Sequence, residues 1–242
     1  MPTQFLDLTN RVLRRVNEVQ MTASNFDSAA NIQALAKDAV VDTCRRINGI
    51  RNDWPFNAVE HTQVLTIGVN EYAWPSQFSE ADWLSFQLQK DDTLGVPYRQ
   101  LKHIEREQWY TYFRDEDYDN LSTGLRAPEY CFPSHGAGFG VSPIPDKAYT
   151  IKYRYYSTPT DLSIYTDQPT IPSKFDYVII NGALAMMNMF RENNDGFTAM
   201  EKAFKDGLDD LTRTYLPNPE HLYEGRVNFG GGNHNSWVWK GM

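Results

Sequence analysis

The sequence Pro172-Ser173-Lys174-Phe175-Asp176, which continues as YVIINGALAMMNMF to Phe190, decides the fold of this chain of 242 residues. A serine followed three residues later by an acid predicts a capping box at the start of a helix. The apolar residues beyond it recur at helical spacing and form a wide face, so this helix needs other helices around it. The face comprises Phe175, Val178, Ile179, Ala183, Met186, Met187 and Phe190, and Met186, Met187 and Met189 are expected to fill the core.

A second helix is expected directly afterwards, beyond the polar turn Asn193-Asn194-Asp195-Gly196. Pro217 and Pro219 end it, because proline lacks the backbone N–H that a helix interior requires. Its apolar residues keep the helical spacing and are expected to face inward: Phe197, Met200, Phe204, Leu208, Leu211 and Tyr215.

The remaining helical partners lie at the beginning of the chain. A first helix is expected with Thr3 as its N-cap, and a long second helix from Asp27 or Ser28 to Gly49, after a turn at 22–26. These two helices should pack antiparallel, but two helices cannot close a core. Helices from both ends must therefore meet in one antiparallel bundle of about four helices. The first helix is expected to bury Phe5, Leu8, Val12, Val16 and Val19.

Between the two helix pairs the hydrophobic period changes from 3.6 to 2, which predicts strands. Two hairpins are expected, one joining 59–66 to 71–74 and one joining 138–144 to 149–156. Several short strands with turns between them favour an antiparallel β-sandwich or barrel-like domain. The fold class is therefore α+β, with the β domain inserted into the helical bundle. Further strands are expected near 84–88, 97–103 and 129–133, with a short helix at 104–113.

The expected organisation has four parts. They are the first half of the bundle (1–53), the inserted β domain (54–171), the second half of the bundle (172–216) and an extended C-terminal arm (217–242). The arm is rich in glycine and asparagine and has no helical period, so alone it cannot bury enough apolar surface to fold. Its apolar residues predict docking on a partner or a neighbouring subunit: Tyr223, Phe229, Trp237, Val238 and Trp239.

Charge and composition exclude several classes of protein. With 23 basic and 31 acidic residues, a net charge of −8 and a pI near 5.1, the chain is not expected to coat nucleic acid. The most apolar run, 178–190, is shorter than the roughly 20 residues of a membrane-spanning helix. The first residues lack the pattern of a secretory signal, so we expect the protein to stay where it is made. Cys44 and Cys131 are expected to be buried thiols.

None of the candidate catalytic, cofactor or metal motifs has the residue spacing that its chemistry requires. The glycines of 136–140 open a strand where a nucleotide loop would open a helix. Three aspartates in 115–119 have calcium-loop spacing, but Asn120 and Arg126 stand where glycine and a bidentate glutamate are required. The five histidines have no ligand spacing, and no nucleophile elbow is present. We therefore expect no catalytic residue, no cofactor and no metal site.

Charged side chains gather on two of the expected helices, basic on the first and acidic on the last. Most such clusters face solvent, but their opposite signs also suit an interface between subunits. The candidate interface residues are Arg11, Arg14 and Arg15 on one side and Asp206, Asp209 and Asp210 on the other.

Several stretches together resemble the head-to-tail adaptor proteins of short-tailed bacteriophages, also called connector or tail tubular A-like proteins. They are FLDLTNRVLRRVN at 5–17, NDWPF at 52–56, the segment from PIP at 143–145 to YRYY at 153–156, and the capped helix after Pro172. The resemblance covers residues 3 to about 216. It matches the C-terminal arm least.

The resemblance implies a structural virion protein without enzymatic activity, located in the phage neck and assembled in the host cytoplasm. Such proteins form a ring, typically of twelve subunits, between the portal and the tail nozzle. The ring lines the DNA exit channel without specific binding of DNA, and it involves no membrane. An acidic channel wall would repel phosphates and let the genome slide, which agrees with the net charge of −8.

Two other functions stay open from the sequence. One is a virion protein that binds a receptor or carbohydrate, with exposed Trp83, Trp109 and Tyr110 as a sugar platform. The other is a hydrolase with an unrecognised site, which a cleft with converging perturbed carboxylates would support.

Overall fold

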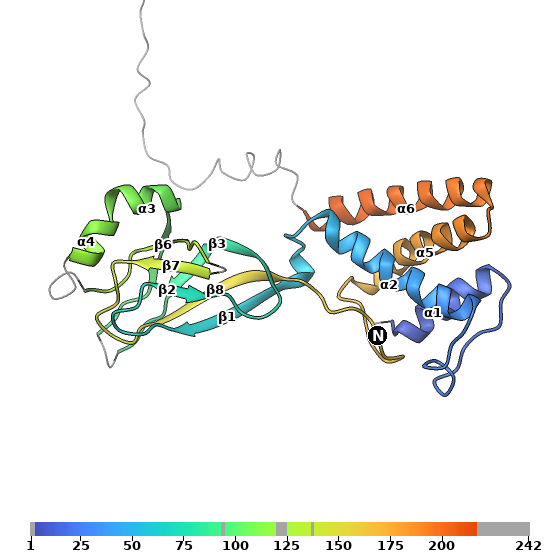
Figure 1. Ribbon diagram of the computed structural model, residues 1–242, viewed down its shortest axis with the longest axis horizontal. Helices are drawn as coiled ribbons and strands as arrows, with labels where there is room; N and C mark the ends of the chain where they lie inside the picture. Colours follow the sequence, from blue (N-terminus) through green and yellow to red (C-terminus); the bar gives the residue numbers. More distant parts are fainter. Residues whose placement is uncertain (1–2, 93–94, 120–124, 137, 217–242) are drawn as a thin grey trace, which may run out of the picture.

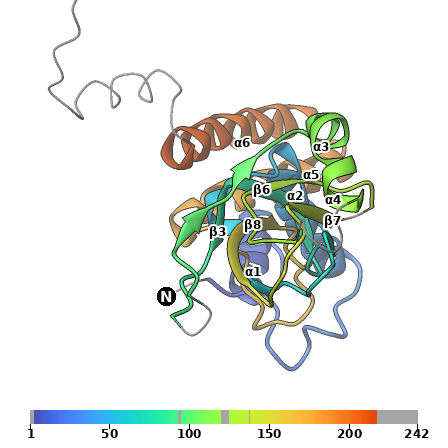
Figure 2. The ribbon, with the colours of Figure 1, turned by 90° about the vertical axis from the view of Figure 1, so that its left-hand side faces the viewer.

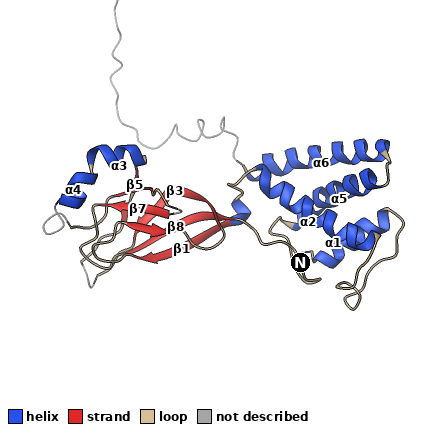
Figure 3. Cartoon of the chain, in the orientation of Figure 1, coloured by secondary structure: helices blue, strands red, loops and turns tan. Residues whose placement is uncertain are grey.

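A computed structural model gives the structure of the chain and describes residues 3–92, 95–119, 125–136 and 138–216. The molecule is elongated, with four long helices at one end and the strands at the other (Figure 1). Two short helices lie at the far end of the strand part (Figure 3). The helices are α1 (Phe5–Arg15), α2 (Ile32–Ile50), α3 (Arg106–Tyr112), α4 (Arg114–Asp119), α5 (Asp176–Phe190) and α6 (Asn194–Tyr215), with 3-10 turns η1 (Pro55–Asn57) and η2 (Ser173–Phe175).

Helix α5 is the centre of the helical part, and α1, α2 and α6 all contact it. Most of its predicted apolar face is buried, including Val178, Ile179 and Met187. Phe190 and Met189 are instead 65% and 62% exposed, so the expectation that they fill the core was wrong. They lie in the last turn of α5, beyond the reach of the packed neighbours. Helices from the two ends of the chain thus share one hydrophobic core.

The start of α2 differs from the prediction. The helix begins at Ile32 and not at Asp27 or Ser28, and Asn31 precedes it with a φ of +52°. Asparagine tolerates this left-handed conformation better than most residues. The preceding loop buries Phe26, whose ring lies 5.1 Å from that of Phe5. Phe26 is thus buried in this region, whereas Val19, which was expected to be buried, is 77% exposed.

The predicted capping residues of α1 and α5 have other roles. Gln4 is the N-cap residue of α1, and Thr3 instead donates its hydroxyl hydrogen bond to Oδ2 of Asp176, at 2.5 Å. No side chain caps α5, which continues from η2, so the capping box predicted at Ser173 was wrong. Asp176 serves as an acceptor that connects the start of α1 to the start of α5.

The strands form two four-stranded sheets, ordered β1-β8-β3-β4 and β2-β7-β6-β5. Both predicted hairpins were wrong, because β1 pairs with β8 and β2 pairs with β7. The strands of each predicted hairpin belong to different sheets. The strand bounds are β1 (Ala58–Val64), β2 (Glu71–Ala73), β3 (Phe78–Leu88), β4 (Arg99–Gln100), β5 (Lys102–His103), β6 (Tyr130–Pro133), β7 (Gly138–Ser142) and β8 (Thr150–Ser157).

Side chains from both sheets share a second hydrophobic core. Phe86 of β3 stacks on Tyr153 of β8 with ring centroids 4.6 Å apart, and Phe139 of β7 meets both rings edge-on. All pairings in the first sheet are antiparallel, whereas β5 runs parallel to β6 in the second. The sheets do not close into a barrel. The α+β class is therefore confirmed, with a mixed second sheet in place of a purely antiparallel one.

The chain crosses twice between the helical part and the strand part (Figure 1). The first crossing runs through η1, where Trp54 is fully buried in the helical core and donates its indole N–H to the Ile47 carbonyl at 3.0 Å. The second is the segment 158–172, which adds Leu162 and Ile171 to the same helical core. Both crossings are therefore anchored in the helices.

Candidate interaction surfaces

The basic side of α1 is one of the two charged surfaces that the sequence predicts. Nη1 of Arg11 lies 3.0 Å from Oδ2 of Asp176, and Nη1 of Arg15 lies 3.3 Å from Oδ1 of Asn181. Arg14 is exposed and forms no ion pair with any described residue. Arg11 is thus paired with a carboxylate within the chain, whereas Arg14 and Arg15 are exposed and Arg15 contacts only the neutral amide of Asn181 among the described residues.

The acidic side of α6 is the second charged surface. Asp206, Asp209 and Asp210 are all exposed, and none of them pairs with a cation among the described residues. Asp210 accepts a long hydrogen bond of 3.5 Å from the hydroxyl of Tyr177. The three carboxylates therefore project outward without neutralising partners in the described part of the chain.

The two charged surfaces belong to helices that lie apart from each other in the helical part. Helices α1 and α6 both contact α5, and both views place α6 along one side of the molecule and α1 on the other (Figures 1 and 2). The structure therefore does not bring the arginines and the aspartates together within one subunit. Opposite charges on two separate helices, left unpaired within the described part of one subunit, suit contacts between copies.

Two arginines of α2 hold neighbouring elements on different sides of this helix. Arg46 makes hydrogen bonds of 2.6 and 3.0 Å to Glu201 of α6, and Arg45 makes bonds of 2.7 and 2.8 Å to Asp161 of the second crossing. Hydrogen bonds from these arginines lower the pKa of Glu201 and of Asp161. Because the Arg45–Asp161 pair is more than half exposed, it fixes orientation more than it adds stability, whereas Glu201 in the other pair is mostly buried.

A groove with a volume of about 410 Å³ lies on the Arg45 side of α2, where the helical part meets the strand part; we call it the junction groove. Asn57 is 5% exposed and donates from Nδ2 to Oδ1 of Asn48 at 3.0 Å. Oδ1 of Asn57 has no hydrogen-bond partner among the described residues. The lining comes from α2 (Val41, Cys44, Arg45, Asn48, Gly49), the first crossing (Arg51, Asn52, Asn57), strand ends Ser79 and Ser157, and the second crossing (158–162 and 168–170).

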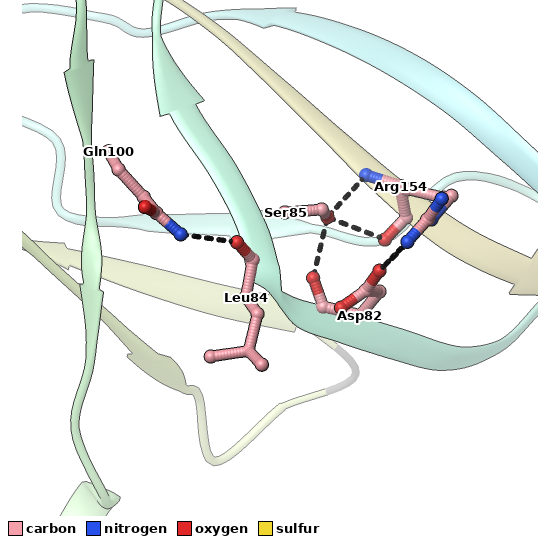
Figure 4. A network of polar contacts seen from close by, with 5 residues as sticks. All are labelled: Asp82, Leu84, Ser85, Gln100 and Arg154. Carbon is pink, nitrogen blue, oxygen red and sulfur yellow. Dashed lines mark hydrogen bonds and ion pairs between the residues drawn. The ribbon is translucent and has the colours of Figure 1, made fainter. Parts of the chain in front are cut away.

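The outer face of the first sheet carries a polar network at an irregular part of β3 (Figure 4). Ser85 Oγ donates to the Asp82 carbonyl at 2.6 Å and accepts the backbone N–H of Arg154 at 2.8 Å. The Arg154 guanidinium pairs with the Asp82 carboxylate. Gln100 donates to the carbonyl of Leu84, whose side chain is 75% exposed. Where the pairing of β3 with β8 shifts register, this network thus gives hydrogen-bond partners to backbone groups that are not paired between the two strands.

Comparison with known protein families gives a match to the family described as SU10 adaptor protein over residues 3–221. The chain belongs to the SU10 adaptor protein family. This confirms the resemblance to phage head-to-tail adaptors and makes the protein a phage structural adaptor, a kind of protein that associates with portal and tail proteins in the virion neck. A search of the curated proteins found no match.

The aromatic platform proposed for carbohydrate binding is not present in this SU10 adaptor. Trp109 is 3% exposed, stacks on Phe132 at 4.4 Å and donates its indole N–H to Asp117. Trp83 is half-buried between other rings, and only Tyr110 is largely exposed. The expectation of exposed Trp83 and Trp109 was wrong because both side chains complete the packing of the strand part.

The carboxylates with shifted pKa values in the described part of the chain lie in separate environments. Lowered pKa values belong to Glu60, Asp161, Asp167 and Glu201, and each of these faces a cation or backbone amides. Asp117 alone has a raised pKa, caused by burial. Among the residues that the structure describes, no three His, Cys, Asp or Glu side chains could hold a metal. Likewise, none of the described helices is long and apolar enough to cross a membrane.

Asp117 predicts a measurable pH dependence. Its folded-state pKa is raised above the unfolded value of 3.8, so the folded state holds this proton more tightly. Unfolding free energy should therefore fall as pH rises from about 4 through the raised pKa, and this slope should be lost in Asp117→Asn. Urea unfolding at a series of pH values measures the difference. Glu60→Gln is the control with the opposite sign, because Lys152 lowers the pKa of Glu60. If the difference in unfolding free energy between the unaltered chain and Asp117→Asn does not change with pH, the raised pKa of Asp117 is contradicted.

The arm residues Tyr223, Phe229, Trp237, Val238 and Trp239 lie outside the described residues. Sequence reasoning did not find the junction groove, because its lining comes from segments that are far apart in the sequence. Asn57 directly follows Trp54-Pro55-Phe56, and both Trp54 and Asn57 are buried. The two cysteines are buried and free as expected, and burial raises the pKa of each thiol to about 12.

Proposed function

We propose that this SU10 adaptor forms a ring, of twelve subunits as in the phage adaptors it resembles, between the portal and the tail nozzle. The ring assembles in the host cytoplasm, becomes part of the virion neck and surrounds the DNA exit channel. The helices of 1–53 and 172–216 build the ring wall, and the strand part within 54–171 faces outward or toward tail components. The family match supports the structural role.

The observation that carries the proposal is the placement of the charges on α1 and α6. Arg14 and Arg15 are exposed on α1, and Asp206, Asp209 and Asp210 are exposed on α6, a helix set apart from α1 beside α5 (Figure 2). A surface that complements a different surface of the same molecule makes a heterologous contact. Repeated with a constant rotation, such a contact closes into a ring. The α1 side of one subunit then meets the α6 side of the next.

The net charge supports passage of DNA through this ring. The chain carries −8, and the basic residues of α1 would be neutralised by aspartates of the neighbouring subunit. A wall with little free positive charge offers phosphates few contacts, and phosphate contacts supply most non-specific DNA affinity. The DNA therefore slides without being bound.

Native mass spectrometry of the full chain, alone and with an isolated portal ring, tests the proposed ring. The expected species alone is a closed ring near twelve times the 27.9 kDa subunit mass, and a complex of both rings forms with the portal. A chain that stays monomeric both alone and with the portal would show that the proposal is wrong.

Deletion of 229–242 is expected to weaken docking on the portal or between subunits without unfolding the helical part. The reason is that residues before 217 already form the two described hydrophobic cores. Native mass spectrometry measures assembly, and urea unfolding followed by circular dichroism measures stability. Normal assembly of the truncated chain would contradict the role given to the arm.

A further inference from the structure

We propose that the free edge of strand β1 pairs, in antiparallel orientation, with the same edge of a second copy of this chain. The two copies then share one continuous sheet. Strand β1 ends the sheet β1-β8-β3-β4, so β8 is its only neighbour in that sheet. It lies at the lower margin of the strand part (Figure 3). This pairing goes beyond the proposed ring contact, which involves α1 and α6, and does not depend on it.

The β1 edge differs from the other three sheet edges in the described part of the chain. Strands β2, β4 and β5, which end the sheets elsewhere, have three, two and two residues, whereas β1 has seven. Proteins usually protect an edge strand by keeping it short, or with proline, lysine or a β-bulge. The β1 sequence AVEHTQV contains no proline or lysine, and its pairing with β8 has no register shift. A regular edge of this length is suited to pairing with another strand.

The pairing with β8 shows which backbone groups of β1 lie at the free edge. The N–H of Leu65 donates to the carbonyl of Tyr149, which is the opposite residue when the register of β1 and β8 is continued. Backbone groups in an antiparallel pair alternate in direction, so Val59, His61 and Gln63 bond to β8. The alternate residues therefore direct their N–H and C=O groups to the free edge: Ala58, Glu60, Thr62 and Val64.

Two of these edge groups already have partners within the chain. The N–H of Ala58 donates to the Pro55 carbonyl. The side-chain amide of Gln63 donates to the Val64 carbonyl at 3.0 Å. The other edge groups have no hydrogen-bond partner among the described residues. They are three donors, the N–H groups of Glu60, Thr62 and Val64, and three acceptors, the carbonyls of Ala58, Glu60 and Thr62.

These free groups complement themselves in one antiparallel register, which is why a second copy is the partner. When Glu60 lies opposite Thr62 of the second copy, every free donor of each copy meets a free acceptor of the other. Ala58 then lies opposite Val64 of the second copy, so the N–H and the carbonyl that already have partners face each other. A two-fold axis at Glu60 or at Thr62 would instead leave a donor of each copy without a free acceptor.

The side chains agree with this register. Glu60 lies opposite Thr62 and not opposite the second Glu60, so like charges do not meet directly. Nζ of Lys152 on β8 lies 2.6 Å from the Glu60 carboxylate and neutralises it within the same chain. Val64 is 57% exposed and would be covered by Ala58 of the second copy. The pairing therefore buries apolar surface without opposing charges.

The two-fold pairing has a consequence for assembly. Paired chains point in opposite directions, with their helical parts at opposite ends. All subunits of one closed ring point the same way along its axis, so two paired chains belong to two rings or are not yet part of a ring. The pairing is thus an interaction of the adaptor outside the assembled neck. There it covers an edge that is otherwise open to nonspecific addition of strands.

Cysteine cross-linking of the full chain tests the pairing and its register. His61 lies at the two-fold axis, opposite itself, at a position where opposite Cα atoms are about 4.5 Å apart. This distance allows a disulfide, so His61→Cys should form covalent dimers under mild oxidation. Val59 and Gln63 lie two residues to either side and face each other across the pair, not themselves. Val59→Cys alone and Gln63→Cys alone are therefore matched controls.

On a non-reducing gel, His61→Cys should give at least tenfold more dimer than either control alone, and a mixture of the two controls should give their mixed dimer. The native Cys44 and Cys131 are buried thiols with raised pKa values and react slowly. Equal amounts of dimer in all samples, or no mixed dimer, would overturn the pairing. A ring of the unaltered chain without these dimers would overturn the pairing alone, whereas dimers without a ring would contradict only the proposed function.

Removing one edge donor is a second test. Thr62→Pro removes an N–H that points away from β8, so the hydrogen bonds between β1 and β8 stay in place. Combined with His61→Cys, it should lower dimer formation at least tenfold, whereas Thr62→Val keeps the N–H and should not. Urea unfolding followed by circular dichroism checks that both variants fold, and the register test does not depend on them. Equal dimer formation with proline and with valine would contradict the inference.

Discussion

Replacing Arg14 and Arg15 by glutamate is expected to weaken subunit association about tenfold or more at low ionic strength. Each interface would then oppose two carboxylates to Asp206, Asp209 and Asp210, and like charges repel where opposite charges attracted. The loss occurs at every contact of a ring, so the closed species should disappear at concentrations where the unaltered chain assembles. Sedimentation at several salt concentrations measures the effect, which should shrink as salt screens the charges.

Two further variants make this result specific. Asp209→Arg with Asp210→Arg should weaken association alone but restore it when mixed with the glutamate variant, because the two altered surfaces then complement each other. Lys90→Glu with Lys102→Glu changes the net charge equally in the strand part and should leave assembly unchanged. Equal weakening by this control would show that net charge, and not the α1 surface, governs association.

Trp54→Ala is expected to have the largest effect on stability, a loss of about 3–5 kcal/mol of unfolding free energy. The side chain is fully buried, stacks on Phe56 at 5.3 Å and holds the end of α2 through the Ile47 carbonyl. Phe56 in turn contacts Tyr215, so the cavity would loosen η1 and the end of α6 together. Urea unfolding followed by circular dichroism measures the loss.

Trp54→Phe separates packing from hydrogen bonding in this experiment. It keeps an aromatic ring in the core but removes the indole donor, so its cost should be clearly smaller than that of Trp54→Ala. Equal losses for the two variants would mean that the hydrogen bond dominates. A loss below about 1 kcal/mol for alanine would contradict a structural role for this crossing.

The helical half of the fold could be predicted because its apolar residues repeat at one spacing. Phe5, Leu8 and Val12 are buried as expected, and the central face of α5 was recognised from Val178 and Ile179. The ends of the helices were harder to predict. Whether Ser173 caps a helix depends on a 3-10 turn, and whether Val19 is buried depends on a loop that places Phe26 in the core.

Strand pairing was not predictable by the same reasoning. Alternation located β1 and β8 to within about two residues and found the second half of β3, but it missed the first half of β3, from Phe78 onward. It does not report which strand lies alongside, and both expected hairpins joined strands that belong to different sheets. Strand β8 pairs with β1 and β3, so its partners precede it by many residues.

The interaction surfaces were predicted in part. Charge clusters on single helices are visible in a sequence, so α1 and α6 were recognised, but the packing of both helices on α5 was only visible in the structure. The engagement of Arg11 with Asp176 was not visible, because the two residues are far apart in the chain. The junction groove was missed for the same reason, since α2 and two separate crossings build it.

The double crossing between the helices and the strands has a mechanical consequence. A part attached by one chain can spin about that connection, whereas a part attached by two chains can bend but resists torsion about its long axis. Both connections are also clamped, one by Trp54 in the helical core and the other by Arg45 on Asp161. A torque applied to the strand end is therefore transmitted to the helical end, so the two ends of this molecule turn together.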